Sequence, residues 1–167
     1  MILICYDGSA DARAAIADAG RVLSGHPAIV LTVWAPVTQV LARMAAGSAL
    51  VAGLNTPLPA DEGAAEEAGR VAEEGAELAR AAGFDALARA RAQSGSVADT
   101  IIAQADRANA AAIVMGSRGR TGLQSVLGSV SHAVVQRSDR AVMIVPSPQV
   151  AAGRRERIRR DSAHPAG

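Results

Sequence analysis

A glycine-rich segment at residues 116–136, GSRGRTGLQSVLGSVSHAVVQ, contains the residue types that hold a phosphate group. Glycine lets a backbone turn tightly and approach a ligand closely. Four glycines lie in the first part of the segment: Gly116, Gly119, Gly122 and Gly128. Two arginines, Arg118 and Arg120, place positive charge between them. This pattern predicts a phosphate-binding loop.

The second part of the segment is predicted to open a helix at Gly128. The first amides of a helix have no acceptor inside it, and the helix dipole makes this end positive. We therefore expect the amides that follow Gly128 to attract an anion. The hydroxyls of Ser129 and Ser131 would add hydrogen-bond donors.

Glycine and serine before a helix are also common as a plain turn and N-cap. Here the loop follows an apolar strand, and open α/β sheets bind ligands at the carboxyl ends of their strands. This context favours binding. The segment lacks the Walker pattern GxxxxGK[ST], and the first strand–helix turn, YDGSAD, lacks the GxGxxG dinucleotide pattern.

No catalytic or metal-ligating set with a defined spacing is visible. Asp7 is the only acid that the sequence places near the loop, and it would alternatively cap the first helix together with Ser9. His132 is interpreted as a surface histidine. The single cysteine, Cys5, is expected to be a buried, inert side chain. We therefore predict no enzyme activity and no metal site.

Apolar runs alternate with segments of helical period. The expected strands are Ile2–Tyr6, Ala28–Trp34, Ala86–Ala92, Ala111–Met115 and Ala141–Val145. Helices are expected between them: residues 12–23, about 61–82, from a capping box at Ser96 and Asp99, and after Gly128. This alternation predicts an α/β fold: one open five-stranded parallel sheet with helices on both faces. Val40–Met44 could form a turn or two of helix.

The charges are distributed unevenly. All 17 basic residues are arginine. Five of them lie at positions 154–160 against Glu156 and Asp161, a net of +3, so the remaining 12 arginines and 14 acids give −2. We expect residues 1–147 to form one domain and residues 148–167 a disordered basic tail. Without a broad basic face, an apolar span or a signal peptide, we expect a cytoplasmic protein that binds neither nucleic acid nor membranes.

At this point the sequence resembles the universal stress proteins. The resemblance covers residues 1 to about 147 and is carried by ILICYDGSADARAAI, AIVLTVW and IVMGSRGRTGLQSVLGSVSHAVVQRSDRAVMIVP. Members that bind ATP carry glycine, two residues, glycine, nine residues, then glycine and serine or threonine. Gly116, Gly119 and Gly128-Ser129 match these positions, but Arg120–Leu127 is a gap of eight residues instead of nine.

The resemblance implies a Rossmann-like fold of the adenine-nucleotide α-hydrolase type, with the strand order 3-2-1-4-5. It also implies a ligand, ATP, that could bring magnesium with it. It places Asp7 near the ribose or adenine and Val33 against the adenine. Further along, it implies that the ribose and α-phosphate are lined by Met115, Gly116 and Gly119. The outer phosphates would be held by Gly128, Ser129 and Val130.

Two readings of function remain open. The first is a stress-response or signalling module that binds ATP without efficient hydrolysis. The second is an interaction module of the same fold that binds no nucleotide, which the shortened gap would suit. In both readings the resemblance implies a homodimer along Ala141–Val145, which is short, apolar and at the sheet edge.

Overall fold

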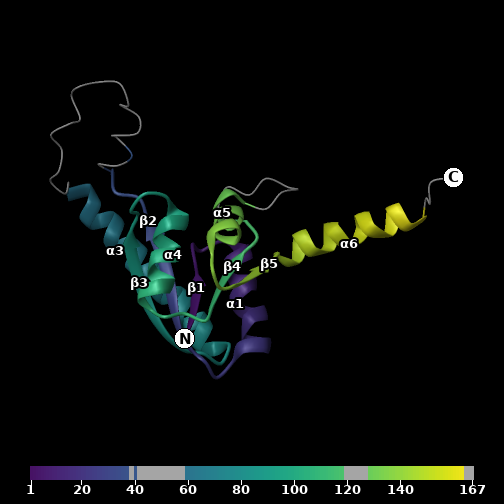
Figure 1. The fold of residues 1–167 in the computed structure, drawn as a ribbon, viewed down its shortest axis with the longest axis horizontal. Helices are drawn as coiled ribbons and strands as arrows, with labels where there is room; N and C mark the ends of the chain where they lie inside the picture. Colours follow the sequence, from purple (N-terminus) through teal and green to yellow (C-terminus); the bar gives the residue numbers. More distant parts are fainter. Residues whose placement is uncertain (38–39, 41–58, 119–127, 164–167) are drawn as a thin grey trace.

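The structure, a computed structural model, describes residues 1–37, 40, 59–118 and 128–163, with side chains described up to residue 160. The residues beyond Val40 in the possible turn Val40–Met44, and the loop positions 119–127, lie outside the described residues. Figure 1 shows a central sheet with helices packed on two sides and one further helix projecting from the body.

The sheet has five parallel strands in the order β3-β2-β1-β4-β5, as predicted. Their bounds are β1 Ile2–Cys5, β2 Pro27–Trp34, β3 Asp85–Ala92, β4 Ala112–Gly116 and β5 Ala141–Val145. The central strand β1 pairs with β2 from Ile2 opposite Ala28, and with β4 from Ile2 opposite Ala112. Chain order therefore reverses at β1, and the ends of β1 and β4 lie side by side.

The helices begin where the sequence offers caps. Ser9 caps α1, Ala10–Leu23, by accepting a hydrogen bond from the Ala12 amide. The capping box predicted from Ser96 and Asp99 opens α4, Val97–Arg107. The other helices of the body are α3, Pro59–Ala81, and α5, Ser129–Arg137.

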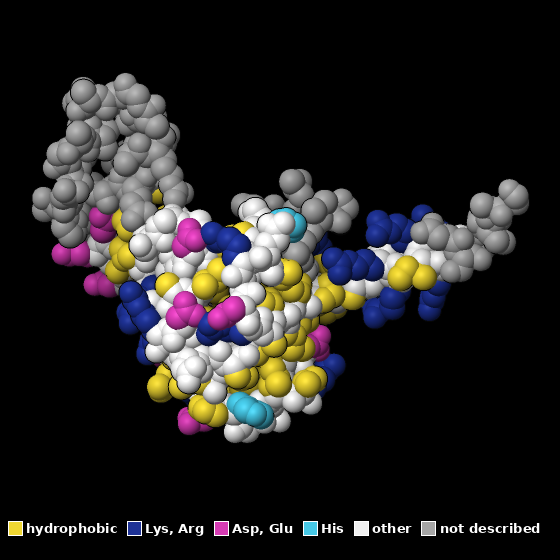
Figure 2. Space-filling view, in the orientation of Figure 1, with side chains coloured by type: hydrophobic (Ala, Val, Ile, Leu, Met, Phe, Trp, Pro, Cys, Tyr) yellow, Lys and Arg dark blue, Asp and Glu magenta, His cyan; other side chains and the backbone are white. Residues whose placement is uncertain are grey.

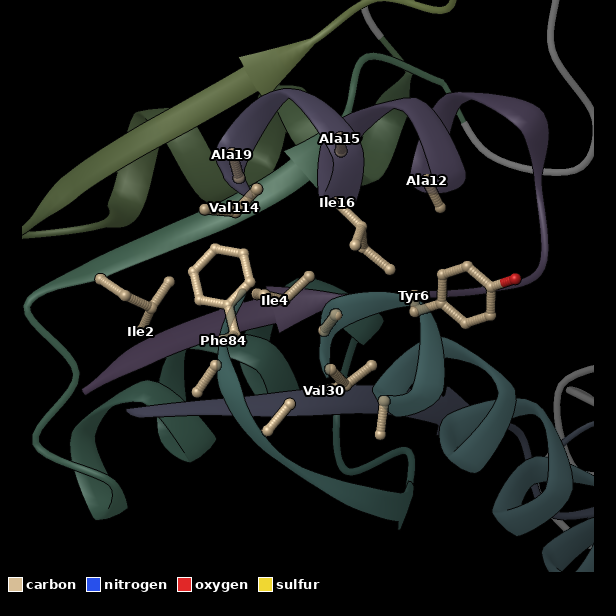
Figure 3. Packing of buried hydrophobic residues seen from close by; sticks show 14 of the residues in the cluster. Ile2, Ile4, Tyr6, Ala12, Ala15, Ile16, Ala19, Val30, Phe84 and Val114 are labelled. Atoms are coloured by element: carbon tan, nitrogen blue, oxygen red, sulfur yellow. The ribbon is translucent and has the colours of Figure 1, made fainter. Parts of the chain in front are cut away.

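Two hydrophobic cores lie on opposite faces of the sheet because successive strand residues point to opposite sides. One core packs β1 and β2 against α1 and α3, and Figure 3 shows Ile4, Ile16 and Phe84 meeting within it. The other core packs alternate strand residues such as Leu3 and Ile113 against α4 and α5. These layers hold the starts of α1 and α5 at fixed positions beside the ends of β1 and β4.

The chain after residue 147 differs from the expected disordered tail. It forms a helix, α6, Pro148–Ala163, which Figure 1 shows projecting away from the body. Proline is favoured in a first helical turn, and the Ser147 carbonyl accepts the Ala151 amide. Alanine and arginine are strong helix formers, which accounts for helix here in spite of the missing apolar period.

Among the described residues, no helix is long and apolar enough to cross a membrane.

Candidate functional site

The carboxyl ends of β1 and β4 meet the first turns of α1 and α5. In an open parallel sheet, the place where strand order reverses leaves a crevice in which ligands bind. The strand order puts this place between β1 and β4. The segments predicted to carry the site, residues 7–11 and 115–131, are therefore brought to one edge of the sheet.

The turn after β1 is built by Asp7, Gly8 and Ser9. Gly8 has a φ of +79°, which glycine adopts without strain. The Asp7 carboxylate accepts a hydrogen bond from the Ser9 amide at 3.0 Å, while the Ser9 hydroxyl accepts the Ala12 amide at 3.1 Å. The helix cap is thus Ser9, and Asp7 supports the turn leading to it. The Asp7 side chain is partly exposed and lies just beyond the carboxyl end of β1.

The start of α5 has the form that the glycine-rich segment predicts. Gly128 is the N-cap, and none of the side chains that the structure describes caps the helix there. Ser129 is exposed, and Val130 packs partly against the second core. The amides of Ser129, Val130 and Ser131 therefore open the helix at its positive end.

Ser131 has a different role from the one predicted for its hydroxyl. The side chain is buried, and its oxygen lies 3.1 Å from the Ser117 carbonyl and 2.9 Å from the Gly128 carbonyl, to which it donates. The Gly128 amide also donates to the Ser117 carbonyl, at 2.9 Å. The Ser131 hydroxyl thus ties the start of α5 to Ser117. It is not available as a donor to a phosphate, so only the backbone amide of Ser131 keeps the predicted role.

Sequence reasoning missed Asp11, and Asp7 is not the only acid near the loop. Asp11 lies in the first turn of α1 and is 8% exposed. Its Oδ2 atom accepts a hydrogen bond from the Ser117 hydroxyl at 2.7 Å and lies 3.8 Å from Nε of Arg118. The sequence shows that Asp11 follows the N-cap Ser9 by two residues. It does not show the contacts of Asp11, because its partners lie more than a hundred residues away.

Gly116 allows α1 to approach β4. A Cβ atom at this position would lie 2.7 Å from the Asp11 carbonyl carbon and 2.9 Å from the Ala12 nitrogen. Real side chains do not reach such distances, so glycine is required here for packing. This reason is independent of the ribose contact that the resemblance implies for Gly116.

The remaining predicted site residues are Val33, Met115, Arg118 and Gly119. Met115 is buried at the end of β4, and Val33 is partly buried near the end of β2; both belong to the core beneath α4 and α5. Arg118 is largely buried beside Asp11, with its side chain 15% exposed. Gly119, together with Arg120 and Gly122, lies outside the described residues.

The other reactive side chains do not join the site. His132 is exposed on α5, as expected of a surface histidine. Cys5 is partly buried, and burial, followed by the negative charge of Asp7, raises the pKa of its thiol to about 12. The thiol is therefore unreactive at neutral pH. Within the described ranges, no three His, Cys, Asp or Glu side chains are placed to hold a metal ion.

The fold and this edge define a class of protein: a parallel α/β domain with an open helix N-terminus at the point where strand order reverses. Comparison of the sequence with protein-family models matches the universal stress protein family over residues 1–146. The chain belongs to that family. A search of curated proteins found no match.

Solved structures share the fold. A universal stress protein from Archaeoglobus fulgidus is 22% identical, with a TM-score of 0.59 over 86% of this chain and 96% of that one. The structure of the A. fulgidus protein in complex with dAMP is 20% identical, with a TM-score of 0.57 over 86% and 95%. A universal stress protein in complex with cAMP is 23% identical, with a TM-score of 0.56 over 87% and 95%.

Proposed function

We propose that this chain binds ATP at the edge formed by β1, β4 and α5. The observation that carries the proposal is the start of α5, where the N-cap is a glycine and therefore offers no side chain to the first-turn amides. These amides, from Ser129 to Ser131, would bind the outer phosphates, with the positive charge of Arg118 nearby. A magnesium ion would arrive with the nucleotide.

The sugar and base would lie toward β1 and β2. Asp7 would accept a hydrogen bond from the ribose or adenine, and Val33 would contact the adenine face. Met115, Gly116 and Gly119 would line the ribose and α-phosphate. The solved relatives with cAMP and dAMP support an adenine nucleotide as the ligand class.

We propose that binding, and not turnover, is the function, in a cytoplasmic stress-response or signalling module. Phosphoryl transfer needs a positioned nucleophile and neutralisation of the charge on the transferred group. His132 lies one turn into α5, exposed, and its amide donates to the Gly128 carbonyl. Asp11 already accepts from Ser117. Incubation with ATP and magnesium should therefore release phosphate far more slowly than the roughly 1–100 per second of kinases.

We also propose a homodimer formed along β5. This strand is at the edge of the sheet, and its residues Val142, Met143 and Ile144 are only partly buried. Figure 2 shows hydrophobic side chains on the side of the body from which α6 projects, next to β5. A dimer without nucleotide binding is the second candidate function, and the eight-residue gap after Gly119 is the observation that favours it.

A calorimetric titration with ATP separates the two candidates, and Gly128 offers a matched pair of variants. Its φ of −59° suits any residue, and a Cβ atom would lie 3.4 Å from the Ser117 carbonyl oxygen, an ordinary contact. Gly128→Ala should fold and retain ATP, whereas Gly128→Leu should fold and lose most of the affinity. No heat of binding with the unaltered protein would refute ATP binding and leave the interaction module.

A further inference from the structure

Three side chains form a charged cluster that the glycine pattern does not include. Asp11, Ser117 and Arg118 come from the start of α1 and the end of β4. Ser117 is fully buried and donates its hydroxyl to Asp11 at 2.7 Å. The Asp11 and Arg118 side chains are 10% and 15% exposed, with the guanidinium Nε 3.8 Å from the carboxylate. The cluster thus holds a carboxylate, largely shielded from water, beside the proposed phosphate site.

The Asp11 carboxylate is connected to the start of α5 through one residue. The Ser117 hydroxyl donates to Asp11, and the Ser117 carbonyl accepts the Gly128 amide at 2.9 Å. The path therefore consists of one residue and two hydrogen bonds, and the Debye length at 0.1 M salt is about 10 Å. The negative charge of Asp11 would therefore repel phosphates bound at the first turn of α5, because salt screens partly buried charges only weakly.

We propose that Asp11 is a specificity-determining residue: its carboxylate offsets part of the attraction that the α5 amides and Arg118 exert on each added phosphate charge of the bound adenine nucleotide. The inference rests on the proposed function and concerns a residue that lies outside the predicted phosphate contacts. Asp11 repels each added phosphate charge and competes with the ligand for Arg118. The site thus accepts a triphosphate best when magnesium has reduced its charge, and it accepts AMP irrespective of magnesium.

The test compares Asp11→Asn with Asp18→Asn, which removes the same charge from the same helix. Asp18 lies about 10 Å further along α1, since each residue adds 1.5 Å, and it pairs with Arg21. Asparagine at position 11 still offers an oxygen to the Ser117 hydroxyl. Affinities are measured by calorimetry for AMP, for ATP with a chelator, and for ATP with magnesium. Asp11→Ser provides a second uncharged variant if the first does not fold.

Asp11→Asn should raise the affinity for magnesium-free ATP about fivefold or more, as expected for removing one nearby charge. It should change AMP affinity by a clearly smaller factor, because AMP has one phosphate and ATP adds two more at the start of α5. Asp18→Asn should change neither. Equal changes for AMP and magnesium-free ATP, or weaker ATP binding, would overturn the role of Asp11 while leaving nucleotide binding intact. If the unaltered protein binds no adenine nucleotide, the proposed function fails, and this inference fails with it.

Discussion

Tyr6, the residue that follows β1, is joined to α3 by a hydrogen bond from its hydroxyl to the Glu74 carboxylate. The hydroxyl donates to Glu74 at 2.6 Å, and Arg13 donates to the same oxygen at 2.7 Å. Burial, followed by the hydrogen bond to Glu74, raises the pKa of Tyr6 to about 12. The same hydrogen bond, followed by that from Arg13, lowers the pKa of Glu74.

The ionisation of Tyr6 is directly measurable because it is the only tyrosine in the chain. Its folded pKa is above the value near 10 of an unfolded tyrosine. Its stabilising effect is therefore complete below about pH 10 and is lost as the pH rises toward about 12. Absorbance at the phenolate band should show a midpoint near pH 12, and Glu74→Gln should lower it. A midpoint near pH 10 in the folded, unaltered protein would contradict this contact.

Local residue patterns predicted one side of the site but not the other. Gly128 and Ser129 were readable because a helix start is encoded by adjacent residues, and the structure places α5 there. The contact of Asp11 with Ser117 joins residues far apart in the sequence, and neither residue belongs to a motif that names its partner. Gly116 was assigned to the ligand, but the structure also requires it for the approach of α1.

Strands and body helices were predicted well at the element scale because their signals are local. Apolar runs became four of the strands, while β3 alternates alanine with Arg89 and Arg91. The Ser96–Asp99 capping box became the start of α4. The segment after residue 147 was not predicted to be helical, since α6 has no apolar face to give a period. Its exposed residues include Arg154, Arg155 and Ile158.

Removing α6 tests whether the chain divides into a domain and a dispensable extension. Figure 1 shows α6 extending away from both cores, so its removal uncovers little apolar surface. A chain ending at Ser147, which is itself buried, should lose helical circular dichroism but less than about 0.5 kcal/mol of unfolding free energy. A loss of several kcal/mol would show that α6 packs against the body or a partner copy.

The strand order was predictable at the scale of the whole molecule. A strand, a helix and a parallel strand cross over right-handedly in about 98% of cases, which limits the orders of five parallel strands, and the family resemblance selects one of them. The structure has the predicted order, with β3 and β5 at the two edges. Assembly could not be derived in the same way, because an open edge indicates where pairing can occur and not whether it does.

Replacing Met143 tests assembly along β5. Met143→Glu places a charge on the edge strand, where pairing of two copies would leave it desolvated. We expect sedimentation at micromolar concentration to change from dimer to monomer. Val22→Glu is the matched control, because Val22 is 72% exposed on α1, and this variant should remain dimeric. A monomer in the unaltered protein would exclude the proposed dimer.

The most direct measurement of the central claim is a proton–nitrogen correlation spectrum titrated with ATP and, separately, with adenosine. If the phosphates bind at the start of α5, the amides of Ser129, Val130 and Ser131 should shift strongly with ATP, as expected for new hydrogen bonds to an anion. Adenosine, which has no phosphate, should leave these amides nearly unchanged. Shifts confined to other parts of the protein, or equal shifts with both ligands at residues 129–131, would contradict the phosphate site.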